Sequence, residues 1–175
     1  MQPSGAPPSS SAADLWQPAF IGLGSNLGDS RAYIARAAAA IGAIPGVRVI
    51  RLSPLYRTAP FGPVAQDAFV NAVLGVLTQL APQALLEALR AIEVGLGRSA
   101  TRVRWGPREI DLDLLVQGEL RVESATLSLP HPGIPERDFV LYPLRDIAPA
   151  LEIPGLGRVR ELAARVIDRG IERLD

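Results

Sequence analysis

Two carboxylates two residues apart, Asp111 and Asp113, are the side chains in this sequence best placed to do chemistry. They lie in residues 110–116, a short segment rich in branched apolar residues that ends before Gly118 and is typical of a β-strand. Alternate residues of a strand share a face, so the two acids should lie side by side, with Cα atoms roughly 6.5–7 Å apart. Neighbouring carboxylates repel each other and are costly to desolvate. A hard divalent cation such as Mg²⁺ would remove both problems.

Positive charge precedes this acid pair. Arg98, Arg102, Arg104 and Arg108 lie just upstream, and Trp105 lies between the last two. Guanidinium groups match phosphate oxygens in bidentate geometry, and a tryptophan ring can cover a base or a guanidinium. Together these residues predict a site for a metal–polyphosphate complex. The alternative is a surface ladder of ion pairs between an arginine-rich loop and the acidic strand.

Other polar residues stand out from their surroundings. Prolines stiffen the loop 58–63, which either presents backbone groups to a ligand or simply joins two strands. Asn71 interrupts an apolar strand, and a buried amide needs partners, either in a neighbouring loop or on a heterocycle. Glu93 falls in the last turn of a helix, where the helix dipole disfavours a carboxylate and an arginine or a ligand is expected as its partner. His131 lies between two prolines, as a structural residue or as part of a site.

Composition excludes several classes of chemistry. The 175 residues carry zero formal net charge, which argues against a nucleic-acid-binding surface. All 18 basic residues are arginine, so a Schiff-base lysine and a P-loop lysine are excluded. There is no cysteine and one histidine, so thiolate chemistry and multi-histidine zinc sites are excluded as well. A metal would therefore be held largely by oxygen.

The N-terminal residues 1–18 are rich in proline, serine and alanine and lack the basic start and apolar run of a signal peptide. We expect them to form a disordered tail, followed by a single domain over residues 19–175. No apolar run is long enough to cross a membrane. We expect a cytoplasmic monomer that acts on small molecules and has neither nucleic acid nor membrane as a partner.

Hydrophobic periodicity and turn residues predict strands at 19–23, 47–56, 69–78 and 110–116 and helices at 30–43 and from 82 to about 95. Ser53-Pro54 suggests either a bend in the second strand or an edge position for it, and either Asn26 or Asp29 should cap the first helix. A hairpin return is expected at 120–122, and a C-terminal helix near 159–166 after interruptions at Pro143 and Pro149. This order predicts a ferredoxin-like βαββαβ sandwich of the α+β class, an antiparallel sheet with helices on one face, with an added hairpin and C-terminal helices.

Several segments in this order resemble the 6-hydroxymethyl-7,8-dihydropterin pyrophosphokinase family. The resemblance covers nearly the whole chain from Phe20 onward, and its most specific motif is Arg104-Trp-Gly-Pro-Arg-Glu-Ile-Asp-Leu-Asp-Leu-Leu115. The other matching segments are 20–28, 56–63, 69–72 and 130–139. Ala100 departs from the family, which often has an arginine there, and Arg102 is a possible substitute.

The resemblance implies a fold, a reaction and a set of site residues. Members transfer diphosphate from ATP, the co-substrate, to the hydroxymethyl group of the dihydropterin in folate biosynthesis, leaving AMP and using two Mg²⁺ ions. Asp111 and Asp113 would bind both metals and, with Arg98 and Arg108, form the catalytic set. The residues expected to bind ATP are Glu93, Arg98, Trp105, Arg108, Leu114, His131 and Arg137. The residues expected to bind the pterin are Thr58, Pro60, Phe61, Phe69, Asn71 and Phe139.

Two other functions fit parts of the sequence. A ferredoxin-like module with a tryptophan in an arginine-rich loop could bind single-stranded RNA, although zero net charge counts against it. Another Mg²⁺-dependent nucleotide transferase or hydrolase is the second alternative. Product identity separates these enzymes, because AMP with a diphosphorylated pterin is specific to the pyrophosphokinase reaction.

Overall fold

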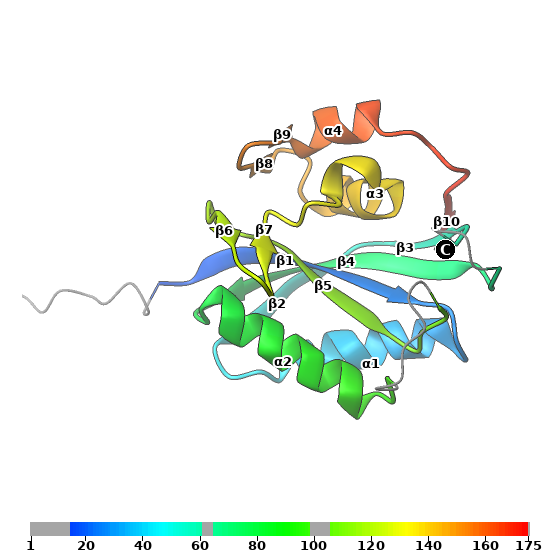
Figure 1. Cartoon of the computed structure of the whole chain (residues 1–175), viewed down its shortest axis with the longest axis horizontal. Coiled ribbons are helices and arrows are strands. Elements are labelled where there is room, and N and C mark those ends of the chain that lie inside the picture. The colour runs from blue at the N-terminus through cyan, green and yellow to red at the C-terminus, as the bar shows by residue number, and fades with distance from the viewer. Residues whose placement is uncertain (1–14, 61–64, 99–105, 175) are drawn as a thin grey trace, which may run out of the picture.

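A single antiparallel sheet with helices on both faces forms the centre of the molecule (Figure 1). The computed structural model describes residues 15–60, 65–98 and 106–174. Within these ranges the sheet has six strands: five follow the order β10-β3-β4-β1-β5, and the sixth, β2, pairs with β4. They are β1 (Gln17–Ser25), β2 (Val47–Leu52), β3 (Leu55–Thr58), β4 (Phe69–Thr78), β5 (Asp111–Gln117) and β10 (Glu172–Leu174).

Helices α1 (Ser30–Gly42) and α2 (Pro82–Gly95) cover one face of the sheet (Figure 1). Alternate residues of β1 point toward these helices, and Ile21 packs in the same fully buried cluster as Ile34 and Leu89. The Asp29 side chain caps α1 by accepting the Ala32 N–H at 3.0 Å, which decides between the two predicted caps. These two helices and the strands that they cover make the predicted ferredoxin-like α+β sandwich.

Helices α3 (Asp138–Ile147) and α4 (Val159–Arg165) lie over the opposite face (Figure 1). A second buried cluster joins them to the sheet, with Val73 and Leu115 packed against Leu141 and Leu144. The Tyr56 hydroxyl of β3 donates to the Asp146 carboxylate of α3 at 2.5 Å, and burial, with this bond, raises the Tyr56 pKa to about 12. The remaining elements are β6 (Val122–Glu123), β7 (Ser128–Leu129), a 3₁₀ turn (Ile134–Glu136), β8 (Glu152–Ile153) and β9 (Gly157–Arg158).

Several predicted boundaries were wrong. Gln17 and Pro18 belong to β1, where they pair with Thr78 and Leu77, so the strand starts before residue 19. The predicted strand 47–56 is two strands, β2 and β3, because the chain bends at Ser53-Pro54. The short β10 was not predicted, and it pairs with β3 at the edge of the sheet.

Two further corrections concern the C-terminal half. No return strand pairs with β5 at residues 120–122; β6 instead pairs with β7, because Ser124 and Leu127 close the turn between them. Pro143 does not interrupt the chain but lies inside α3, buried. A proline within a helix removes one N–H donor, which weakens the helix. Pro143 is nevertheless accommodated in α3, where its ring is buried in the packed face of the helix.

Strand β2 is the most exposed strand of the sheet. Val49, Ile50 and Leu52 are 42%, 62% and 37% exposed, and two arginines, Arg48 and Arg51, are interspersed with them. Within the described residues β2 pairs with β4 alone, so its outer edge has no strand partner.

No helix in the described ranges is long and apolar enough to cross a lipid bilayer.

Candidate active site

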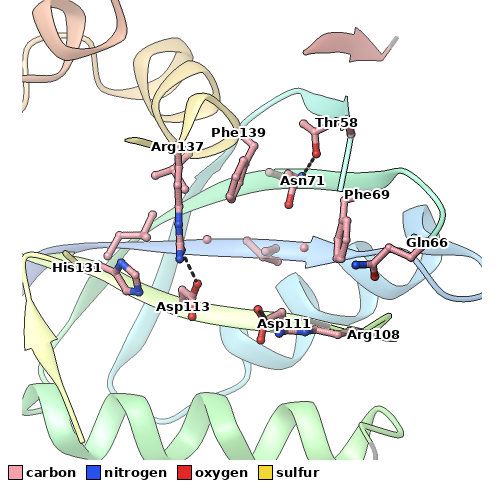
Figure 2. Close-up of a pocket in the computed structure, with 18 of the residues that line it drawn as sticks. Thr58, Gln66, Phe69, Asn71, Arg108, Asp111, Asp113, His131, Arg137 and Phe139 are labelled. Atoms are coloured by element: carbon pink, nitrogen blue, oxygen red, sulfur yellow. Dashed lines mark hydrogen bonds and ion pairs between the residues drawn. The ribbon is translucent and has the colours of Figure 1, made fainter. Parts of the chain in front are cut away.

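A cleft of about 300 Å³ opens on the α3 side of the sheet (Figure 2). Strands β1, β4 and β5 form its floor, the end of β3 and the start of α3 form its walls, and Figure 2 shows side chains from these elements pointing into it. Ten predicted site residues line this cleft and come from five separate parts of the chain: Thr58, Phe69, Asn71, Arg98, Arg108, Asp111, Asp113, His131, Arg137 and Phe139.

The acid pair lies on one face of β5, as predicted from its spacing. In the register with β1, Asp111 lies opposite Gly24 and Asp113 lies opposite Gly22. Because glycine has no side chain, the floor in front of both carboxylates is left open. A β-bulge follows at Leu115, and its side chain packs 3.6 Å from the position that a Gly22 Cβ would take.

Arginines contact both acids. The Arg98 Nη2 lies 2.7 Å from Asp111 Oδ1, and the Arg108 Nη1 bonds Asp111 Oδ2. The Arg137 Nη1 lies 3.5 Å from Asp113 Oδ2, the contact drawn as a dashed line in Figure 2. Charge-assisted contacts of this kind compensate the repulsion between the two carboxylates.

Asp113 and His131 have perturbed acidities. Burial in the cleft, and then the neighbouring Asp111 charge, raise the pKa of Asp113. Burial lowers the pKa of His131, against the opposing effect of Asp113. The His131 Nδ1 accepts the Gly133 N–H at 3.0 Å, so when the ring is neutral its proton lies on Nε2. His131 is thereby fitted to donate a hydrogen bond from Nε2.

The other end of the cleft combines two aromatic rings with an amide. Phe69 and Phe139 stand on either side of Asn71 in the view of Figure 2. The Asn71 Nδ2 donates to the Thr58 hydroxyl at 2.7 Å, which fixes the orientation of the amide. A flat heterocycle could stack between phenyl rings while its edge bonds to Asn71 and Thr58.

Asn26, which does not line the cleft, connects the segments around it. Its Nδ2 donates to Gln66 Oε1 at 3.0 Å and to the Asp67 carbonyl at 3.1 Å. Its Oδ1 accepts the Arg108 N–H at 2.8 Å, while its own N–H donates to the Arg108 carbonyl at 3.0 Å. One buried side chain therefore holds the β1–α1 turn, the segment before β4 and the arginine next to the acid pair.

Two predicted ATP-binding residues lie elsewhere. The buried Glu93 carboxylate accepts the Leu112 N–H at 2.8 Å and forms an ion pair with Arg98. Of the two partners that the sequence left open, the structure therefore provides the arginine, and Glu93 itself does not line the cleft. Leu114 is 2% exposed and packs toward α1 and α2, because strand alternation places it on the face opposite the acids. Pro60 follows the lining residue Ala59. Phe61 and Trp105 lie outside the described residues, as do Ala100 and Arg102.

Several residues around the cleft were not predicted from the sequence. Gln66 lines it and Asn26 supports it, but their contact spans 40 positions in the chain. Gly22 and Gly24 carried a signal, since two glycines on one strand face leave space beside their neighbours.

The donor set fits a hard cation that brings ligands of its own. Among the described residues no group of three or more acidic or histidine side chains could hold a metal ion alone. Mg²⁺ typically binds one or two carboxylates and completes its octahedral shell with phosphate oxygens and water. Two carboxylates over a glycine floor satisfy that requirement when a phosphorylated ligand is present.

A family model and several relatives all indicate the same enzyme family. A family model described as 7,8-dihydro-6-hydroxymethylpterin-pyrophosphokinase matches residues 20–149. The 2-amino-4-hydroxy-6-hydroxymethyldihydropteridine pyrophosphokinase of Methylorubrum extorquens is 47% identical over 157 residues, covering 90% of this chain and 98% of that protein. The enzyme of the same name from Pseudomonas aeruginosa is 45% identical over 158 residues, covering 90% and 97%.

Solved structures share the fold at low identity. The HPPK-DHPS of Plasmodium falciparum with pterin and p-hydroxybenzoate has a TM-score of 0.70 at 16% identity, over 91% of this chain. The match covers 46% of that longer chain, so this protein spans less than half of it. At this identity the likeness establishes the architecture alone.

Proposed function

Because the chain belongs to the 7,8-dihydro-6-hydroxymethylpterin-pyrophosphokinase family, we propose that it transfers diphosphate from ATP to 6-hydroxymethyl-7,8-dihydropterin in folate biosynthesis. The products are AMP and the dihydropterin diphosphate. One observation supports this function at the level of residues: the same cleft contains a pair of acids and a slot between two phenyl rings. The comparisons do not support the RNA-binding alternative.

The pterin occupies the aromatic end of the cleft. Phe69 and Phe139 stack on its two faces, and Asn71 with Thr58 bonds its polar edge. Because the Asn71–Thr58 bond already orients the amide, little ordering is required when the pterin binds. Pro60 and Phe61 complete this end of the site in the proposal.

ATP lies with its phosphates toward β5. Asp111 and Asp113 would hold two Mg²⁺ ions, and such ions would supply positive charge next to the phosphate oxygens. Arg98, Arg108 and Arg137 bind phosphate oxygens, and His131 donates to one of them from Nε2. Trp105 and the backbone at Leu114 contact the nucleoside, whereas Glu93 acts by holding Arg98.

The chemistry is mainly alignment and charge neutralisation. The hydroxymethyl oxygen attacks the β-phosphorus in line, a bond forms between them, and the bond from the β-phosphorus to the α–β bridging oxygen breaks. AMP leaves with that oxygen, and the hydroxyl proton passes to solvent. The chain's own contribution is to hold the two substrates at opposite ends of one rigid cleft.

A product assay tests the proposal. The purified chain with Mg²⁺, ATP and 6-hydroxymethyl-7,8-dihydropterin should yield AMP and the pterin diphosphate in equal amounts, resolved by chromatography and mass spectrometry. ADP or free pyrophosphate as the product would contradict it. Asp111→Ala should retain the fold and lose turnover, whereas Glu123→Ala, an acid on β6 outside the cleft, should retain both.

A cytoplasmic location, a monomeric state and the absence of nucleic-acid binding stay predictions. Cell fractionation, light scattering on the eluted protein and a salt-dependent RNA titration test them. Zero net charge over the whole sequence supports the last of the three.

A further inference from the structure

Both oxygens of the Asp111 carboxylate already have guanidinium partners. Arg98 Nη2 contacts Oδ1 at 2.7 Å, and Arg108 Nη1 contacts Oδ2. These are the oxygens that a metal ion would use, and each has two lone pairs, one of which is engaged by a guanidinium donor. A cation that reaches Asp111 must therefore either share a carboxylate oxygen with a positively charged arginine or displace that arginine from it.

The two arginines are anchored differently. Arg98 is 11% exposed and also pairs with the buried Glu93, so its removal from Asp111 would disturb a second ion pair. Arg108 is 26% exposed, and its backbone is held independently by Asn26 through its N–H and its carbonyl. Its guanidinium can leave Asp111 by side-chain rotation while the backbone stays in place. Figure 2 shows Arg108 lying along the acid at the end of the cleft.

Electrostatics makes the exchange depend on what accompanies the cation. A free divalent ion that displaces Arg108 leaves a positive guanidinium beside a new double positive charge, with water in place of its carboxylate partner. A cation carried by a polyphosphate brings its own oxygens. The displaced guanidinium then bonds phosphate in the bidentate geometry that it prefers, and no charge is left without a partner.

From this geometry we propose that Arg108 determines the specificity of the acid pair for a cation bound to polyphosphate over the free cation. Arg108 competes with the bare ion for Asp111 and becomes a ligand of the phosphates when they arrive. The exclusion of the free ion stands on the arginine contacts alone. The identity of the polyphosphate as ATP rests on the function proposed above.

Metal binding without turnover tests this role. Free Mn²⁺ is titrated by electron paramagnetic resonance into the wild-type chain and into Arg108→Gln, without pterin and with or without ATP. We expect Arg108→Gln to bind free Mn²⁺ about tenfold more tightly, because the loss of one charge-assisted contact at Asp111 removes the competitor. The same variant should bind the Mn²⁺–ATP complex more weakly than the wild type does.

Three controls isolate the cause. Arg108→Lys keeps a competing cation and should stay near the wild-type affinity for free Mn²⁺. The gain should vanish in Arg108→Gln/Asp111→Asn, which lacks the carboxylate in question. Arg145→Gln removes an arginine 3.7 Å from Asp146, outside the cleft, and should change nothing. Circular dichroism confirms that each variant is folded.

Two outcomes would overturn the inference: unchanged or weaker binding of free Mn²⁺ in Arg108→Gln, or an equal gain in Arg145→Gln. A failure of the proposed function looks different. In that case the wild type would bind no Mn²⁺–ATP complex and form no AMP, while the gain for free Mn²⁺ in Arg108→Gln would still be observed.

Discussion

At the scale of single residues, the acid pair combines a functional requirement with a cost to the fold. Asp113 lies in a cleft where burial and the neighbouring Asp111 charge both disfavour its charged form, and its pKa is raised in consequence. A carboxyl group with a raised pKa contributes stability in its protonated form. That contribution is present below the ordinary carboxyl pKa and is lost as the pH rises through the raised value.

Asp113→Asn should therefore stabilise the ligand-free protein at neutral pH and abolish turnover. The amide has no charge to desolvate, so we expect a higher Tm than that of the wild type at about pH 7 and a smaller difference at about pH 4. Thermal denaturation at both pH values measures this. A lower Tm at neutral pH would contradict the assignment of Asp113 as a destabilised carboxylate, and Glu123→Gln serves as an exposed control.

Gly24 matters because of the atom that it lacks. A Cβ at this position would lie 2.8 Å from Asn71 Oδ1, closer than real Cβ contacts allow, so Gly24→Ala should push the amide away from Thr58. We expect the KM for the pterin to rise about tenfold, equivalent to the loss of roughly one hydrogen bond. A Cβ at Gly22 would meet Leu115 at an ordinary 3.6 Å, so Gly22→Ala should fold normally. An unchanged KM in Gly24→Ala would argue against the role of Asn71.

At the scale of elements, the site joins strands of the sheet to the loops that precede and follow them. The β1–α1 turn, the residues before β4 and the residues before β5 meet at Asn26. The strands fix the floor of the cleft, but its walls depend on side chains that bridge loops. Such bridges are expected to control substrate affinity more strongly than the stability of the sheet.

Asn26→Ala should raise the KM for both ATP and the pterin, because the variant frees Arg108 on one side and Gln66 on the other. It should also lower the free energy of unfolding by about 1–3 kcal/mol, since buried partners lose their hydrogen bonds. Steady-state kinetics and urea denaturation measure the two effects. Asn26→Asp keeps the acceptor for the Arg108 N–H and loses the donor to Gln66, so its effect should be intermediate. An effect on one substrate alone would contradict the bridging role.

At the scale of the whole molecule, two apolar clusters lie on opposite faces of one sheet. Because β1 and β4 contribute residues to both layers, neither cluster can lose its sheet while the other persists. We therefore propose that residues 19–175 behave as one domain.

That proposal predicts one cooperative unfolding transition. Circular dichroism and tryptophan fluorescence should report the same midpoint, and the calorimetric enthalpy should equal the van't Hoff enthalpy. Two transitions, with α3 and α4 melting before α1 and α2, would contradict the single-domain prediction.

Local patterns predicted much of this fold. The acid pair on one strand face, the bounds of β4 and the start of α1 and α2 all follow from periodicity and capping residues. The predicted sandwich and the family are confirmed. Strand β10 could not be predicted in this way, because three residues carry no periodic signal and their partner strand β3 lies far earlier in the chain.

The site was predicted less completely, for a physical reason. Alternation along β5 implies that the Leu114 side chain points away from the acids, so its predicted contact with ATP can involve only its backbone. Glu93 was flagged as a carboxylate in need of a partner, but a local pattern cannot tell an arginine from a ligand. The Asn26 contacts depend on how loops meet after folding, and no spacing in the sequence encodes them.

The open edge of β2 bears on how this protein behaves when it is concentrated. A strand with unpaired backbone groups and exposed Val49, Ile50 and Leu52 is a template on which other chains can assemble into fibrils or amorphous precipitate. Arg48 and Arg51 act there as gatekeepers, because like charges on approaching copies repel. With zero net charge over the whole molecule, colloidal stability rests on this local repulsion, so high salt should promote precipitation by screening it.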